Sequence, residues 1–185
     1  MFIYLHGFNS SSQSGKTREM AAWMAERGLA EAFVCPDLPH RPAAAIALLE
    51  DLIARSRGPA KLLGSSLGGF YATWLAEKHG LKAVLINPCV ACHDKLSAYV
   101  GKIQKNWHSG EEYEFSSAHA TELDALRVPA ITRPERYLLL AETGDEVLDY
   151  REAVAYYAGA RQEVLEGGDH GFTRFNEYLP AILAF

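Results

Sequence analysis

The chain has 185 residues, which is enough for one domain with a sizeable core and short for two. Hydrophobic residues make up 49% and charged residues 22%, a composition typical of globular proteins. The net charge of -5 and the lack of a basic run argue against nucleic acid as a binding partner. With no signal-like N-terminus and no apolar stretch of ~18 residues, we expect a cytoplasmic location and no membrane partner.

Short apolar runs alternate along the chain with longer segments whose apolar residues recur at helical spacing. The predicted strands lie at residues 2–5, 33–35, 61–64, 83–86, 137–140 and 163–165. The predicted helices lie at residues 14–27, 43–57, 67–79, 150–158 and 172–184. This alternation predicts an α/β fold, a single domain over residues 1–185 with about six mainly parallel strands and helices on both faces of the sheet.

The third predicted strand runs into the sequence G-S-S-L-G at residues 64–68. This fits the G-x-S-x-G pattern, in which a tight turn between strand and helix holds the central serine, here Ser66, out at its tip. The motif is short, and an ordinary strand-to-helix turn explains it equally well by itself. The residues that follow the other strands must therefore decide between the two interpretations.

An acid and a histidine follow two later strands of the predicted sheet. Asp145 lies in A-E-T-G-D after the fifth strand, and His170 lies in E-G-G-D-H-G-F after the sixth. In a parallel sheet these strand ends meet at one edge. A serine nucleophile needs a histidine base, and the histidine needs an acid to orient it. We therefore predict a catalytic triad of Ser66, Asp145 and His170.

Two other aspartates compete with Asp145 for the role of the acid. Asp149 stands where the helix at residues 150–158 needs an N-cap, and Asp169 is adjacent to His170, so its side chain should diverge from the ring. His6 is predicted to shape its loop by hydrogen bonds, with a role as a second base as the alternative. The histidines predicted to lie at the surface are His79, His93, His108 and His119.

Acyl transfer also requires donors for the negative charge that develops on the carbonyl oxygen. The main-chain N–H of Leu67, directly after the predicted nucleophile, is one expected donor. The second should come from the loop after the first strand, where we choose the N–H of Phe8. These two groups form the predicted oxyanion hole.

No cofactor or metal ion is expected. Cys89, Cys92 and His93 match C-x-x-C-H, the pattern of haem attachment, but that chemistry needs export, and no second cysteine pair completes a zinc site. The residues Ser14-Gly15-Lys16-Thr17 resemble the end of a phosphate-binding loop, but the first glycine of that motif is missing at Ser10. We interpret this stretch as a polar loop with Ser14 as a helix N-cap.

Residues 88–134 interrupt the alternation of strands and helices. No strand is predicted there, so we expect a small helical, cap-like insertion, either a lid over the site or a plain surface connection. The apolar residues that share one face of a predicted helix are Leu96, Tyr99, Val100 and Ile103. We expect this face to pack over the site, with Tyr99 and Trp107 in the substrate pocket.

With these motifs in hand, the chain resembles the YqiA/YcfP-like family of small bacterial esterases in the α/β-hydrolase superfamily. The similarity is carried by FIYLHGFNSS, PDLPHRP, LLGSSLGGFYATWLAE, INP, LLLAETGDEVLDYR and EGGDHGF. The resemblance implies a trimmed α/β-hydrolase fold and an esterase-type serine hydrolase with Ser66, Asp145 and His170 as its triad.

The sequence thus predicts a serine hydrolase whose partner is a small ester or thioester. Alternatives are a thioesterase or other acyl hydrolase on the same site, or a binding protein that keeps the fold without turnover. The sequence leaves the natural substrate and the oligomeric state open.

Overall fold

The structure is a computed structural model that describes residues 1–185. Its main sheet has six strands in the order β2-β1-β3-β4-β7-β8, and every neighbouring pair is parallel. The strands are β1 (Phe2–Leu5), β2 (Phe33–Val34), β3 (Lys61–Ser65), β4 (Lys82–Ile86), β7 (Tyr137–Glu142) and β8 (Arg161–Leu165). The predicted parallel sheet is confirmed.

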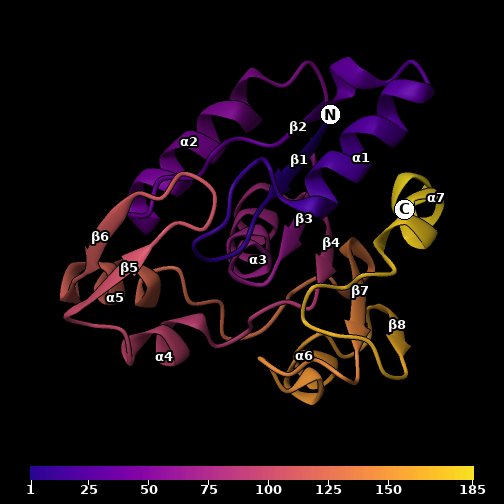
Figure 1. Cartoon of the computed structure of the whole chain (residues 1–185). Coiled ribbons are helices and arrows are strands. Elements are labelled where there is room, and N and C mark those ends of the chain that lie inside the picture. The colour runs from indigo at the N-terminus through magenta and orange to yellow at the C-terminus, as the bar shows by residue number, and fades with distance from the viewer.

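Helices cover both faces of this sheet, as Figure 1 shows: α1 and α7 lie on one side of the line of strands, and α2, α3 and α6 on the other. These helices are α1 (Gly15–Glu26), α2 (Pro42–Arg55), α3 (Leu67–His79), α6 (Tyr150–Tyr156) and α7 (Phe175–Ala184), and short 3-10 turns lie at Ala30–Ala32 and Pro134–Arg136. The ends of the six strands and five helices lie within three residues of the predicted ones, the largest difference being the later start of α7, whereas the two 3-10 turns were not predicted. None of the helices is long and apolar enough to cross a membrane.

Two apolar cores form because successive residues of a strand point to opposite faces of the sheet. Leu62 and Leu63 are adjacent in β3 and both fully buried, but they belong to different clusters. Leu62 shares its cluster with Leu75 of α3, whereas Leu63 shares the other with Met20 of α1 and Ile182 of α7. The continuous apolar runs in the sequence are therefore central strands with both faces covered.

The insertion between β4 and β7 differs from its prediction. It contains α4 (Cys92–Ser97), an antiparallel hairpin of β5 (Lys102–Lys105) and β6 (Glu112–Phe115), and α5 (Ser117–Asp124). The expectation of an insertion without strands is wrong, because these strands are only four residues long and mostly exposed, so charged residues obscure their pattern. Since α4 ends at Ser97, the predicted helical face of Leu96, Tyr99, Val100 and Ile103 does not exist.

The predicted surface position is also wrong for His119, which is only 3% exposed. Its Nδ1 accepts the hydrogen bond from the Ser116 N–H that completes the capping box of α5, and its ring stacks against His40 and Phe115. His93 is also mostly buried, whereas His79 and His108 are exposed as predicted. The capping roles predicted for Ser14 and Asp149 are confirmed, since their side chains accept hydrogen bonds from Thr17 and Arg151.

Candidate active site

Ser66 occupies the turn between β3 and α3 with φ 55° and ψ -119°, a conformation that side chains rarely adopt. The turn is tight enough to exclude a Cβ atom at the flanking glycines. At Gly64 a Cβ would overlap the main-chain carbonyl of Gly68, and at Gly68 it would overlap that of Leu5. The Ser66 N–H donates to Ile86 O at 3.1 Å, and its carbonyl accepts from Gly69 and Cys89. The strained serine is thus held by main-chain bonds on both sides.

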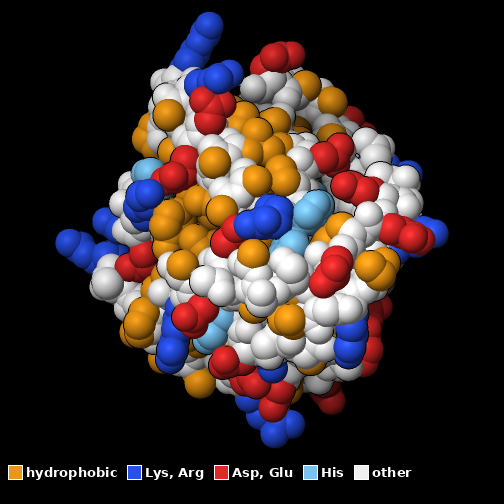
Figure 2. All heavy atoms as spheres, turned by 90° about the vertical axis from the view of Figure 1, so that its left-hand side faces the viewer, with side chains coloured by type: hydrophobic (Ala, Val, Ile, Leu, Met, Phe, Trp, Pro, Cys, Tyr) orange, Lys and Arg blue, Asp and Glu red, His pale blue; other side chains and the backbone are white.

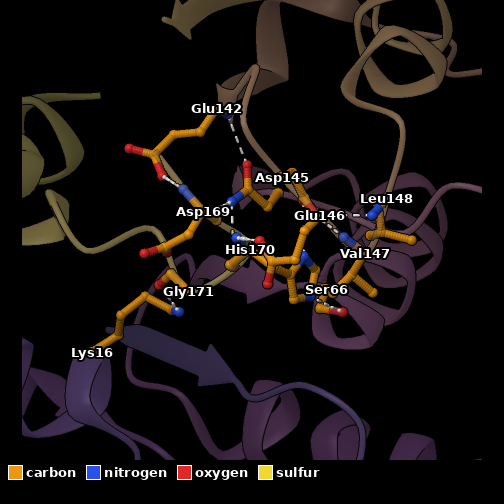
Figure 3. A network of polar contacts seen from close by, with 11 residues as sticks. Lys16, Ser66, Glu142, Asp145, Glu146, Val147, Leu148, Asp169, His170 and Gly171 are labelled. Atoms are coloured by element: carbon orange, nitrogen blue, oxygen red, sulfur yellow. Dashed lines mark hydrogen bonds and ion pairs between the residues drawn. The ribbon is translucent and has the colours of Figure 1, made fainter. Parts of the chain in front are cut away.

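Ser66, Asp145 and His170 come together at the carboxyl edge of the sheet, at the ends of β3, β7 and β8 (Figure 3). The Nε2 of His170 lies 3.0 Å from Ser66 Oγ, and its Nδ1 lies 2.8 Å from Asp145 Oδ2. A proton on Nδ1 satisfies the carboxylate and leaves Nε2 free to accept from the serine hydroxyl. The structure therefore brings together all three residues that the sequence singled out.

The Asp145 side chain is only 2% exposed, yet it is arranged to stay ionised. Burial raises the pKa of Asp145, but hydrogen bonds from His170 and from the N–H groups of Leu148 and Val147 outweigh it, so the net pKa is lowered. The two main-chain bonds to Oδ1 are 2.8 and 2.9 Å long. Asp149 instead caps α6, and its carboxylate accepts from the N–H of Arg151 at 3.0 Å.

The predicted oxyanion donors lie in the same cavity as Ser66 and His170. The N–H groups of Phe8 and Leu67 donate no hydrogen bond to any acceptor of the protein. The loop that carries Phe8 approaches the serine closely, because a Cβ at Gly7 would lie 3.4 Å from Ser66 Cβ. Two unpaired donors beside a serine side chain suit a developing oxyanion.

His6 fixes the loop after β1 and has no ring nitrogen left for a second base. Its Nε2 accepts from the Leu38 N–H at 3.0 Å, and its Nδ1 lies 3.0 Å from Gly7 O. The ring is 5% exposed, and burial lowers the pKa of His6, which favours the neutral form that these two bonds require.

A cavity of about 650 Å³ opens beside the triad. Its apolar lining residues are Tyr4, Phe8, Leu67, Cys89, Cys92, Leu96, Tyr99, Trp107, Val147 and Leu148. Tyr99 and Trp107 are 39% and 75% exposed, and the insertion supplies them from the loop before β5 and from the turn between β5 and β6. Figure 2 shows the face that carries the insertion, where hydrophobic side chains gather with histidine and Lys or Arg side chains beside them. Cys89 and Cys92 are free thiols.

Sequence reasoning missed a set of residues that join the acid loop to the histidine loop. Asn87, at the end of β4, donates from its side chain to Asp169 O and accepts from the Glu142 N–H at 2.9 Å. The Glu142 carboxylate is fully buried, pairs with Arg174 at 2.8 Å and accepts from the Asp169 N–H. The Asn-Pro pair at residues 87–88 was the only local signal, and it indicates no more than the end of a strand.

The comparison with protein families gives one match over the whole chain. The model of UPF0227, described as an uncharacterised protein family, matches residues 1–185. The matched segment therefore includes the insertion as well as all six strands of the main sheet.

Solved structures with the same fold include α/β hydrolase domain-containing protein 10 from mouse, at 15% identity and a TM-score of 0.74, covering 99% of this chain and 87% of that chain. Est1E from Butyrivibrio proteoclasticus matches at 14% identity and a TM-score of 0.66, covering 100% of this chain and 88% of that chain. Tomato methylketone synthase I complexed with 2-tridecanone matches at 12% identity and a TM-score of 0.71, covering 99% of this chain and 96% of that chain. At these identities the likeness shows the fold, and the predicted α/β-hydrolase fold is confirmed.

Proposed function

The chain belongs to the uncharacterised protein family UPF0227, and we propose that it is a serine hydrolase that cleaves small carboxylic esters. The observation that carries the proposal is the hydrogen-bonded chain from Ser66 Oγ through His170 to the Asp145 carboxylate. A serine hydroxyl is a weak nucleophile at neutral pH, and a base that is itself oriented by a carboxylate is what activates it.

In the first half of the proposed reaction, His170 Nε2 takes the proton of Ser66 while Oγ bonds to the ester carbonyl carbon. The carbonyl oxygen becomes an oxyanion, and the Phe8 and Leu67 N–H groups donate to it, each contributing about 3 kcal/mol to the transition state. The bond to the leaving oxygen then breaks, and His170 gives that oxygen the proton. An alcohol departs, and the acyl group stays on Ser66.

In the second half, water replaces the alcohol. His170 takes a proton from the water, whose oxygen bonds to the acyl carbon, and the same N–H groups hold the oxyanion. The bond to Ser66 Oγ breaks as His170 returns the proton to the serine, which releases the carboxylic acid. Asp145 keeps the ring oriented and stabilises its charged form in both halves.

Proteins of this fold support ester chemistry as the reaction class. One structure of Est1E holds ferulic acid, a carboxylic acid. A metagenome-derived protein of the same fold is described as a lipolytic enzyme. The assignment to this chain depends on its own triad, because these proteins share at most 18% of its residues.

The test is hydrolysis of 4-nitrophenyl butyrate, with a thioester and an amide of the same acid beside it. The parent should cleave the ester, and Ser66→Ala should lower turnover by roughly a millionfold while the protein stays folded by circular dichroism. Ser65→Ala is the matched control and should lose far less, since Ser65 lies within β3 and bonds to neither His170 nor Asp145. A parent without turnover on all three substrates would contradict the proposal.

A further inference from the structure

The acidic and basic side chains that line the cavity beside the triad are all basic. Two lysines, Lys16 and Lys95, line the cavity, and no aspartate or glutamate lines it. This is the reverse of the whole chain, whose net charge is -5. Lys95 is neutralised, because its Nζ lies 3.0 Å from the Glu152 carboxylate. The charged lining side chain that forms no ion pair is therefore Lys16.

Lys16 belongs to the first turn of α1, and its ammonium reaches across to the histidine loop (Figure 3). There it donates to the main-chain carbonyl of Gly171, the residue directly after His170. It forms no other hydrogen bond and no ion pair with a carboxylate of the protein. An ammonium has three donors, so two remain for a ligand.

The surroundings of Lys16 are polar, whereas the opposite wall of the cavity is apolar. Ser10 and Ser14 line the cavity with it, as does Tyr4, which is 1% exposed and whose buried hydroxyl has no hydrogen-bond partner. Tyr4 packs with the core under α1, but Cys92 and Leu96 of α4 pack with the core on the other face of the sheet. The cavity thus joins an apolar wall to a cationic one across the edge of the sheet.

The geometry of the proposed reaction assigns these two walls to the two parts of an ester. His170 must hand its proton to the leaving oxygen, so the leaving group departs on the side of His170. Lys16 is hydrogen-bonded to Gly171, the residue directly after His170, and therefore lies on the side of the leaving group. The apolar wall formed by α4 lies across the sheet from Lys16, on the side of the acyl group.

We propose that the substrate is an ester of an apolar acid with an alcohol that carries an anionic group, a carboxylate or a phosphate, which binds Lys16. This inference rests on the proposed function and deepens it. Bond changes are those of an ordinary ester: Ser66 Oγ bonds to the acyl carbon, the carbon–oxygen bond of the alcohol breaks, and the Ser66 proton passes through His170 to the alcohol oxygen. The anionic alcohol leaves on the Lys16 side.

The environment of Lys16 is consistent with a ligand of opposite charge. Burial lowers the pKa of Lys16, and the negative charges of Asp169, Glu19 and Glu142, all too distant to form ion pairs, only partly oppose this effect. A bound anion would stabilise the ammonium and offset the cost of removing it from water.

The test compares two butyrate esters that differ in one charge. One is the butyrate ester of 4-hydroxybenzoate, whose carboxylate is ionised, and the other is the butyrate ester of methyl 4-hydroxybenzoate, which is neutral. The measured quantity is the ratio of kcat/KM for the anionic ester to that for the neutral one. Changes in this ratio between variants cancel the different leaving tendencies of the two phenols.

Lys16→Met should lower the ratio by roughly ten- to a hundredfold, as expected when a charged hydrogen-bonding group loses its partner. Lys16→Arg, which keeps the positive charge, should retain most of the anion preference. Lys95→Met is the matched control and should keep the parent's ratio, because that lysine is already paired. In the parent, added salt should lower the ratio, since it screens the attraction. This measurement needs no variant.

Two further substrate pairs locate and identify the anionic group. 4-Nitrophenyl glutarate carries a carboxylate in its acyl part, and 4-nitrophenyl pentanoate is its neutral counterpart. Lys16→Met should leave the ratio of kcat/KM for these two esters unchanged. The butyrate ester of 4-hydroxyphenyl phosphate replaces the carboxylate by a phosphate, so its ratio tells which anion Lys16 prefers.

An unchanged ratio in Lys16→Met, with all esters still hydrolysed, would overturn this inference and leave the proposed function standing. A change confined to the glutarate pair would place the anion in the acyl part and overturn the assignment to the leaving group. A parent that hydrolyses none of the esters would contradict the proposed function, and the inference with it.

Discussion

The side-chain amide of Asn87 lies 3.0 Å from the main-chain carbonyl oxygen of Asp169 and donates a hydrogen bond to it. The same NH₂ group lies 3.3 Å from His170 O, and the amide oxygen accepts from the Glu142 N–H. One buried side chain directly after β4 therefore connects the end of β7, which leads to Asp145, with the loop that carries His170. We therefore predict that Asn87 is a positioning residue for His170.

Asn87→Ala should lower kcat by roughly ten- to a hundredfold with little change in KM, because His170 loses its alignment while the substrate walls stay in place. The free energy of unfolding should fall by about 2 kcal/mol, since buried main-chain groups lose their partner. Steady-state kinetics and urea unfolding measure the two effects. Asn176→Ala, an exposed change on α7, is the control. A parent-like kcat in Asn87→Ala would show that the loop holds its shape without this residue.

The two aspartates after β7 should differ sharply in their effect on turnover. Asp145→Asn should lower kcat by roughly ten-thousandfold, because a neutral amide neither fixes the tautomer of His170 nor stabilises its charged form. Asp149→Asn should leave kcat near the parent value, since asparagine also caps helices well. The comparison uses one ester under identical conditions. The opposite ranking would move the acid to Asp149.

Stability should respond to pH through Asp145. Its folded-state pKa lies below the ordinary value, so the stabilisation is fully present above the unfolded pKa of about 4 and is lost as pH falls through the lower folded pKa. Urea unfolding at intervals from pH 7 to pH 3 should show the parent's advantage over Asp145→Asn staying constant down to about pH 5 and shrinking below about pH 4. An advantage that grew on acidification would mean that burial raises the pKa of Asp145 more than its hydrogen bonds lower it.

The apolar wall should set the preference for acyl length. Tyr99→Ala and Trp107→Ala remove ring surface that a longer acyl chain would cover, and apolar contact contributes about 25 cal/mol per Å². We expect kcat/KM to fall more for octanoate than for acetate esters of 4-nitrophenol. Ile103→Ala is the matched control, because Ile103 is 65% exposed on the hairpin but does not line the cavity. An unchanged length profile in both cavity variants would make the insertion a scaffold without a role in the pocket.

The sequence was most informative where chemistry and local geometry coincide. Ser66 could be predicted because a strained turn demands glycines at fixed spacing, and His170 because it follows a strand in a glycine-rich loop. The roles proposed for Asn87 and Lys16 could not be predicted, since they depend on loops that are far apart in the chain and meet only in the fold. The hairpin of β5 and β6 escaped because charged residues interrupt its alternation, although Tyr113 and Phe115 alternate as strand residues do.

The most direct test of the central claim is labelling with a fluorophosphonate, which reacts with an activated serine, followed by mass spectrometry of the peptides. We expect a single label on Ser66 of the folded protein, no label after denaturation in urea, and much slower labelling in His170→Ala, whose serine lacks its base. A folded parent that takes up no label, or takes it up on Ser65 or another serine, would contradict the assignment of Ser66 as the nucleophile.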